Sequence, residues 1–355
     1  MTDKRHSTDI LYLKKKLKYS FIILVLIFIL FLTIVLAVFI GPTNIPIHTI
    51  ISILLSKIPC INSFILHSWQ PYEEVIVVLI RLPRVVLGAV VGSALSIAGC
   101  SMQGIFRNPM ADPYIIGISS GAGFGACLSI VFGISTVGSY TVPVFAFLGA
   151  LCTAFIVCRI ATVGGKIPTN TLLLSGIAVG SFFSACISFL IYHAGERLHG
   201  VIFWLMGGLW GADWTAVSIV FPTVLASSLI LIFFAKTLNA LQLGEEQAHH
   251  SGINVERSKI LILIFSVLIT SVAVAFTGTI GFVGLIIPHM TRIFVGPNHR
   301  ILLPVSTLIG AIFLVWADTI ARSISPEDFP VGMITAFCGA PFFAYLLKTQ
   351  KRWRL

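Results

Sequence analysis

The side chains that could carry out chemistry are few and scattered in this sequence. His249 and His250 are adjacent, and His289 stands three residues before Arg292 in the segment PHMTR. Neither group has further ligands at zinc-site spacing, so His289 is interpreted as a hydrogen-bonded structural histidine. The seven cysteines include no CxxC pair. These residues therefore predict no metal centre and no disulfide framework.

Motifs for covalent and nucleotide chemistry are also missing from the sequence. The apolar runs contain no HExxH, no Ser–His arrangement and no aspartate pair, which argues against an intramembrane hydrolase. No GxxxxGK[ST] phosphate loop occurs anywhere in the chain. We therefore expect no enzyme activity and no bound cofactor, and any ATP and Mg²⁺ would have to be held by a separate ATPase.

The composition is that of a polytopic membrane protein. Of 355 residues, 57% are hydrophobic and only 10% are charged, too few to cover a soluble protein. The run from Phe21 to Ile40 has no charge and is long enough to cross a hydrocarbon core of about 30 Å. Lysines precede this run, but no A-x-A cleavage pattern follows it, so we expect an uncleaved first spanning helix.

The apolar runs predict an all-α fold with about ten transmembrane helices. A basic tail at 1–19, a single transmembrane domain at 20–348 and a basic tail at 349–355 are expected. The seventh and eighth helices should form a tight hairpin, because only a short glycine-containing segment separates them. The expected helices are 20–40, 84–104, 112–133, 142–161, 171–192, 215–236, 258–278, 281–296, 301–321 and 330–348.

The basic residues orient the chain. If the N-terminus is cytoplasmic, most of the 23 lysines and arginines fall in inside segments, as the positive-inside rule requires. The outer segments hold only Lys57, Arg81, Arg84, Arg197 and Arg322. Both termini should therefore be cytoplasmic. The net charge of +10 is spread between apolar runs, so the lipid bilayer and not a nucleic acid is the expected partner.

Intramembrane acidic residues are scarce. Of 13 aspartates and glutamates, only Asp318 lies inside an expected span rather than in a loop, in a tail or at a span's first residue. Ion-coupled secondary transporters and pumps need such groups in the membrane. A secondary transporter is therefore a remote alternative, and the energy for transport should come from another subunit.

Small residues at intervals of four predict close helix packing in lipid. A direct role in contacting substrate is a less favoured alternative for the same residues. The packing candidates are Gly88, Gly92, Gly117, Gly121 and Gly125, and the same spacing recurs at Gly176, Gly180 and Ser184.

Five sequence blocks resemble one family of transport proteins. The chain is similar, from about residue 75 to 348, to the ABC importer permeases that take up iron-siderophores, haem and vitamin B12 (FecCD-type permeases). The blocks occur in the family's order and are RLPRVVLGAVVGSALSIAGCSMQGIFRNPMADPYIIGISSGAGFGA from Arg81, LGEEQAHHSGINVER from Leu243, GTIGFVGLIIPHMTRIFVGPNHRILLP from Gly278, WADTIAR from Trp316 and FPVGMITAFCGAPFFAYLL from Phe329.

The resemblance implies an architecture and a set of partners. It implies the inverted-repeat, type II ABC importer fold in the cytoplasmic (inner) membrane of a bacterium or archaeon. The expected partners are a second permease copy or a close paralogue, two ATP-binding subunits and an extracytoplasmic substrate-binding protein. The expected cargo is an iron(III)-siderophore-type chelate, with cobalamin or another corrinoid, or haem, as alternatives.

The segment at about 237–258 is the longest internal inside loop. Gly244 and Gly252 bracket a short stretch with helical composition, which predicts a compact helix–turn–helix rather than a solvated loop. The resemblance implies that this is the coupling loop that seats on the ATPase. The residues that match the family's pattern are Gly244, Glu245, Glu246, Ala248 and Gly252, whereas His250 and Ser251 depart from it.

Two further sets of residues are assigned by the resemblance. Arg81, Arg84 and Arg322 on the outer face would dock the binding protein, and Thr169 and Asn170 fall at the family's inner gate. Asp318 lies four residues before Arg322, so an intrahelical ion pair is an alternative for that arginine. Thr169 and Asn170 could alternatively act as the N-cap of a helix that begins near residue 171.

Overall fold

The computed structural model describes residues 2–59, 63, 65–324 and 329–350, and in that part of the chain the secondary structure is helical apart from one isolated β-bridge. The C-terminal basic tail from residue 351 on lies outside the described residues. The helices of the first half are α1 (Thr2–Phe39), α2 (Ile47–Ser56), α3 (Pro71–Val75), η2 (Ile76–Arg81), α4 (Leu82–Phe106), η3 (Pro113–Ile116), α5 (Ile118–Phe132), η4 (Gly138–Tyr140), α6 (Thr141–Ala161) and α7 (Thr169–Tyr192). Those of the second half are η5 (Gly195–Arg197), α8 (Leu198–Met206), α9 (Trp214–Phe233), α10 (Ala235–Leu243), α11 (Glu245–His250), α12 (Val255–Thr277), α13 (Val283–Val295), α14 (His299–Ile324) and α15 (Val331–Gln350).

Each of the ten expected helices coincides with an observed helix. Within the described residues, seven helices are long and apolar enough to cross a membrane, and α5, α13 and α15 are shorter apolar helices. The polytopic all-α fold is therefore confirmed, but the number of ten spans is not. The helix α8 was not expected, because its nine residues are too short to give a spanning signal.

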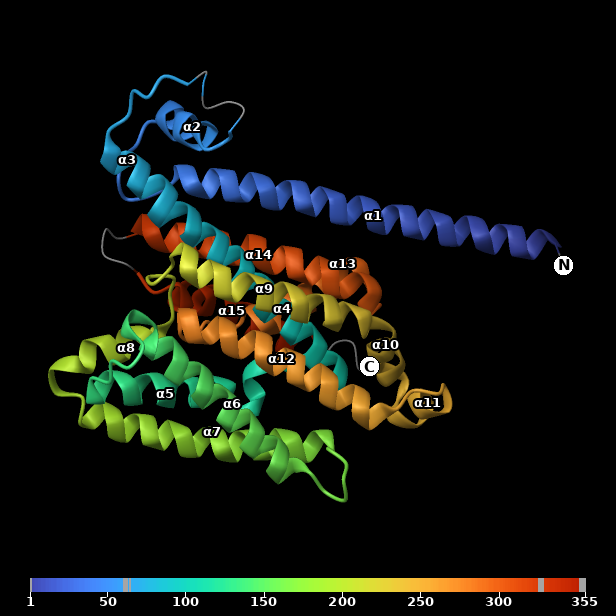
Figure 1. Cartoon of the computed structure of the whole chain (residues 1–355). Coiled ribbons are helices and arrows are strands. Elements are labelled where there is room, and N and C mark those ends of the chain that lie inside the picture. The colour runs from blue at the N-terminus through green and yellow to red at the C-terminus, as the bar shows by residue number, and fades with distance from the viewer. Residues whose placement is uncertain (1, 60–62, 64, 325–328, 351–355) are drawn as a thin grey trace.

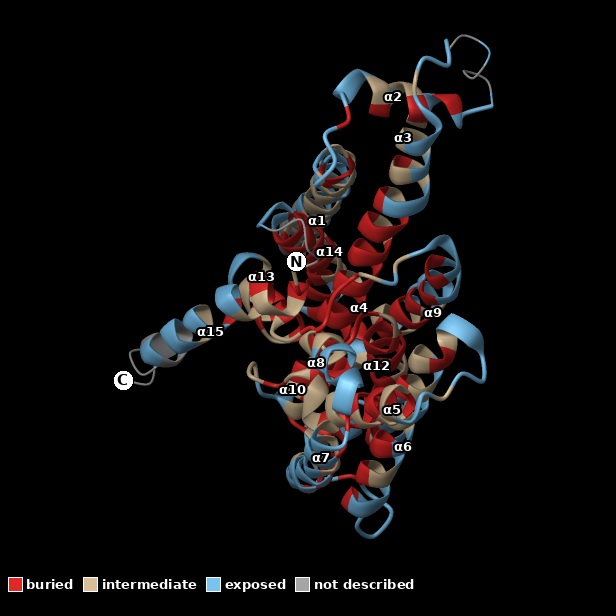
Figure 2. Cartoon of the chain, turned by 90° about the vertical axis from the view of Figure 1, so that its left-hand side faces the viewer, coloured by how far each residue is buried: buried red, intermediate tan, exposed pale blue. Residues whose placement is uncertain are grey.

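The helix α4 forms the centre of the molecule. Almost all of its residues are buried, and α1, α9, α12, α13 and α14 pack around it (Figure 2). A second group, α5 to α8, lies beside it and is joined to it through contacts of α12 with α5 and α6 (Figure 1). In Figure 2, α15 projects away from the rest of the chain.

A π-helical segment joins α3 to α4. Proline at position 83 has no N–H, and in an α-helix its ring would clash with the carbonyl four residues earlier. Widening of the turn over Ile76–Arg81 accommodates Pro83 without breaking the helix. The 36-residue helix Pro71–Phe106 therefore carries Arg81 and Arg84 into the bundle.

The expected hairpin of the seventh and eighth helices is wrong. After α12 ends at Thr277, the chain runs through Gly278 and Gly281, and α13 packs on α4 and α14 rather than along α12. The reason is backbone contact between α4 and α13, where a Cβ on Gly99 would overlap the carbonyl of Gly284. This close approach fixes α13 on α4.

The glycines singled out in the sequence lie in different environments. A Cβ on Gly92 would overlap the carbonyl of Gly310 in α14, and one on Gly121 or Gly125 would overlap α6. Gly88 is less tightly packed, because a Cβ there would lie 3.1 Å from a Leu209 methyl group. Gly117 has φ +80° and forms the turn between η3 and α5, a conformation that favours glycine.

Candidate functional site

The helices α10 and α11 form a compact helix–turn–helix at one end of the bundle. Gly244 joins them with φ 127° and ψ 152°, a conformation that is essentially restricted to glycine. Ala248 of α11 is fully buried in a small apolar cluster with Leu241 and Val255. The expected helix–turn–helix is present, and we call this end of the molecule the α11 end.

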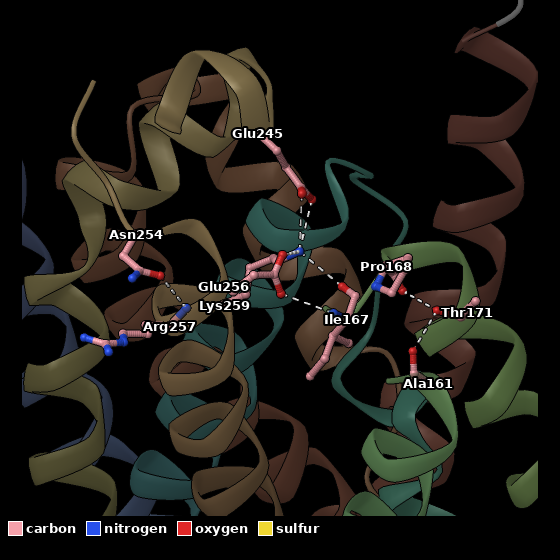
Figure 3. A network of polar contacts seen from close by, with 9 residues as sticks. All are labelled: Ala161, Ile167, Pro168, Thr171, Glu245, Asn254, Glu256, Arg257 and Lys259. Carbon is pink, nitrogen blue, oxygen red and sulfur yellow. Dashed lines mark hydrogen bonds and ion pairs between the residues drawn. The ribbon is translucent and has the colours of Figure 1, made fainter. Parts of the chain in front are cut away.

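A buried lysine lies directly beneath α11. Lys259, in the first turns of α12, is 2% exposed. Its Nζ lies 2.8 Å from Oε1 of Glu256 and 3.3 Å from both carboxylate oxygens of Glu245 (Figure 3). Two carboxylates thus surround one buried ammonium group, which compensates the cost of removing this charge from water.

The same lysine reaches the loop between α6 and α7. Lys259 Nζ donates to the carbonyl of Ile167 at 3.1 Å, and the N–H of Ile167 donates to Oε2 of Glu256 at 3.1 Å (Figure 3). Both backbone groups of Ile167 are therefore held by side chains of α12. The structure joins α11, α12 and this loop in one polar network.

The α6–α7 loop leads into the expected gate residues. Val163 and Lys166 pair across Gly164 and Gly165, both with positive φ. The helix α7 starts at Thr169 with Pro168 at the N-cap position, so the N-cap alternative for Thr169 and Asn170 is wrong. Thr169 is half-buried and Asn170 is exposed.

Thr171 fixes the first turn of α7. Its Oγ1 donates to the carbonyls of Pro168 at 2.9 Å and Ala161 at 3.1 Å, which ties α7 back to the end of α6. The expected gate residues thus follow, within three positions, the residue that Lys259 holds. Their role as a gate stays a prediction.

A hollow lies between α5 and α7, and its wall combines small and polar residues with larger apolar ones such as Ile177 and Ile187. Its volume is about 620 Å³, and its lining includes Ser119, Ser120, Gly176, Gly180, Ser181 and Ser184. The spacing of Gly176, Gly180 and Ser184, interpreted above mainly as packing, was the sequence signal for this surface. Serine hydroxyls and bare backbone give the hollow a wettable wall.

The three outer arginines are buried at the opposite end of the bundle. Arg81, Arg84 and Arg322 are 3%, 8% and 5% exposed. Arg81 donates to the carbonyls of Val38, at 3.1 Å, and Thr43. The burial of these side chains was not expected for a docking surface.

Arg322 shares this environment with α1. It donates to the carbonyl of Ile40 at 3.1 Å. Arg81 and Arg322 thus supply hydrogen-bond donors to carbonyls at the C-terminal end of α1, which have no partner within the helix. Asp318 bridges the arginines, with Oδ1 3.0 Å from Nε of Arg84 and Oδ2 2.9 Å from Nε of Arg322. The alternative of an intrahelical Asp318–Arg322 ion pair is confirmed.

Comparison with known proteins identifies the family. Residues 28–349 match the model of the FecCD transport family. The chain belongs to this family. The cobalamin import system permease protein BtuC of Halobacterium salinarum is 51% identical over 278 residues, which cover 78% of this chain and 74% of that protein. The hemin transport system permease protein HmuU of Yersinia pestis is 40% identical over 281 residues, covering 78% and 84%.

A solved structure agrees with this assignment. A metal-chelate type ABC transporter in an inward-facing conformation has a TM-score of 0.79 and 33% identity, and the match covers 93% of this chain and 99% of that one. This member of the FecCD family is therefore a multi-pass membrane permease of an ABC importer and not itself an enzyme. Other FecCD relatives are named for Fe(3+)-citrate and molybdate import, so family membership alone does not define the cargo.

The described histidines of this FecCD permease belong to no cluster of metal-ligating side chains. Among the described residues there is no group of three or more His, Cys, Asp or Glu side chains that could hold a metal ion. No hydrogen bond is made by Nδ1 of His289, so the interpretation of His289 as hydrogen-bonded is not supported there. The buried structural histidine is His299, whose Nδ1 lies 3.1 Å from Oδ1 of Asn239. Asn239 is 60 residues away in the chain, so the sequence showed no sign of this contact.

Proposed function

We propose that this FecCD permease forms the membrane pathway of an ATP-driven importer, with the α11 end and both termini on the cytoplasmic side of the cytoplasmic membrane. The distribution of lysine and arginine supports this orientation. The scarcity of intramembrane carboxylates supports an external energy source.

Two ATP-binding subunits would supply the energy and hold ATP and Mg²⁺. The docking element would be the helix–turn–helix of α10 and α11, with Gly244, Glu245, Glu246, Ala248 and Gly252. Support comes from its geometry: glycine turns bound α11 at both ends, and the buried Ala248 packs the short helix against Leu241 and Val255. A force applied to α11 would then be transmitted instead of being lost in a flexible loop.

A second permease copy or a close paralogue would complete the pathway. The hollow beside α7 is lined in part by serines and glycines, residue types that are enriched where helices pack together in membranes. Covering this surface with a second subunit would enclose a path between the two chains, with both polar and apolar side chains in its wall. The projecting helix α15, with exposed Phe337, offers further apolar surface for the same contact (Figure 2).

The cargo would be a metal-centred chelate, with a corrinoid as the first candidate. The observation that carries this choice is the 51% identity to a cobalamin permease, against 40% to a hemin permease. An iron(III)-siderophore, expected from the sequence, is the second candidate and is also consistent with the structural similarity to a metal-chelate type transporter.

An extracytoplasmic binding protein would deliver the cargo at the end of the bundle that carries Arg81, Arg84 and Arg322. Because these guanidinium groups are engaged with α1 and Asp318, docking on them would require a rearrangement of this end. Thr169 and Asn170 would close the path at the cytoplasmic side.

The test is to isolate the complete complex with its binding protein and to identify the retained ligand by mass spectrometry. A cobalt corrinoid is the expected result, and ATP-dependent uptake of labelled cyanocobalamin into proteoliposomes should follow. Retention of an iron chelate, with no corrinoid uptake, would select the second candidate. Retention of neither class would contradict the proposed cargo.

A further inference from the structure

Lys259 is unusual because it is a cation buried at the α11 end, where Lys166 and Lys236 are exposed. It is also the largest fully buried side chain among the described residues. A lysine that only signals membrane orientation would extend into solvent. The burial of Lys259 therefore indicates a specific contact.

Its partners come from three separate elements. Glu245 belongs to α11, Glu256 belongs to α12 with Lys259 itself, and Ile167 belongs to the α6–α7 loop (Figure 3). Among the hydrogen bonds and ion pairs of the described residues, no other side chain of this network links α11 to the loop. Lys259 is therefore the single link through which these two segments are joined in this network.

The contacts of Lys259 are unequal. The pairing with Glu256 is shorter, 2.8 Å against 3.3 Å, and the Glu256 side chain is less exposed than that of Glu245, 26% against 38%. Glu256 also holds the N–H of Ile167. Lys259, Glu256 and Ile167 thus form the part of the network with the shortest ion pair, and the contact with Glu245 connects this part to α11.

The loop continues directly into the wall of the hollow. Ile167 is followed by Pro168 at the N-cap of α7, and Gly176 and Gly180 of α7 line the hollow. Because an α-helix moves as a rigid element, a displacement of Ile167 that shifts the start of α7 would also shift these two glycines. A continuous chain of contacts therefore runs from α11 to the candidate pathway.

We propose that Lys259 is a positioning residue that couples α11 to the α6–α7 loop, so that movement of α11 shifts the start of α7. This inference rests on the proposed function, because it assumes that an ATPase acts on α11. It assigns to Lys259 a role in energy transmission, in addition to stabilising the fold.

The experiment compares Lys259→Met with Lys259→Arg and with Lys236→Met, an exposed lysine on the same end as the matched control. Each variant is purified with its ATPase, and uptake of labelled cyanocobalamin per ATP hydrolysed is measured in proteoliposomes with the binding protein. Lys259→Met should lower this ratio about tenfold while ATP hydrolysis continues, in the usual range of coupling energies. Lys259→Arg should restore most of it, and Lys236→Met should leave it unchanged.

A second measurement does not depend on the cargo. Fluorophores placed through unnatural amino acids at His250, Lys166 and Arg300 report distances in nucleotide-free and ATP–vanadate states. In the unmodified chain, His250 and Lys166 should move together relative to Arg300. In Lys259→Met, His250 should move without Lys166.

The outcomes separate the inference from the proposed function. Independent movement of His250 and Lys166 in the unmodified chain would overturn the coupling role of Lys259, and so would an unchanged uptake ratio in Lys259→Met. A purely structural role would lower complex yield in Lys259→Met without changing uptake per ATP. Failure of the unmodified chain to bind any ATPase would instead overturn the proposed function, and the inference with it.

Discussion

Gly99 of α4 and Gly284 of α13 lie in direct backbone contact. A Cβ on Gly99 would overlap the carbonyl oxygen of Gly284, and a Cβ on Gly284 would lie 2.9 Å from the carbonyl of Leu95. Without a hydrophobic driving force between helices in lipid, such close approach supplies the packing energy. This contact explains why α13 packs on α4 instead of forming a hairpin with α12.

Gly99→Ala should therefore destabilise the protein, although alanine is the better helix former. The added methyl group meets backbone that cannot move aside, and overpacking of this kind costs about 1–3 kcal/mol. Thermal unfolding of the purified protein in detergent measures the effect. Gly211→Ala is the control, since a Cβ there meets nothing within 4 Å. Equal melting temperatures for the two variants would contradict the proposed packing.

Asp318→Ala should be among the most damaging single changes at the end that carries the arginines. It removes the carboxylate shared by Arg84 and Arg322 and leaves two buried cations beside each other, at a cost of about 3–5 kcal/mol. Lys57→Met breaks the exposed Lys57–Glu74 pair and should cost no more than about 1 kcal/mol. Detergent melting curves compare the two, and a similar loss in both would disagree with the role of the buried network.

The double variant Arg81→Ala, Arg84→Ala tests docking of the binding protein. We expect weaker affinity in proteoliposomes, because removal of both charges disturbs electrostatic complementarity with the partner. We also expect lower stability, because Arg81 no longer satisfies carbonyls near the end of α1. Lower stability with unchanged affinity would assign these arginines to the fold alone.

Gly244→Ala combined with Glu245→Gln should uncouple ATP hydrolysis from uptake. Alanine at position 244, where φ is 127°, costs about 1–3 kcal/mol and displaces α11. Glutamine at position 245 weakens the contact with Lys259. Hydrolysis and uptake are measured together in the reconstituted complex. Coupled uptake at the unmodified ratio would count against α10 and α11 as the coupling element.

The sequence predicted the helices well because their signal is local. Each apolar run of sufficient length became a helix, and the glycines at 244 and 252 correctly indicated the helix–turn–helix. The helix α8 was missed because nine residues cannot give a spanning signal. Periodicity and composition depend only on neighbouring residues, so they predict elements and not their contacts.

Contacts between distant segments could not be predicted in this way. The sequence indicated only that Lys259 is not one of the outer basic residues, and its burial depends on Ile167, which lies 92 residues earlier. Arg81 was expected at an exposed mouth, and its burial depends on where α1 ends. The only sequence signal for the hollow beside α7 was the spacing of its small residues, which we interpreted mainly as helix packing.

The central claim is that this chain is a pathway whose energy comes from a partner ATPase. The most direct measurement is uptake of labelled cyanocobalamin into proteoliposomes that contain either the chain alone or the chain with its ATPase, both with the binding protein outside. Accumulation should require both the ATPase and ATP inside the vesicles and should persist when ion gradients are collapsed. Accumulation by the chain alone, driven by an ion gradient, would contradict the claim.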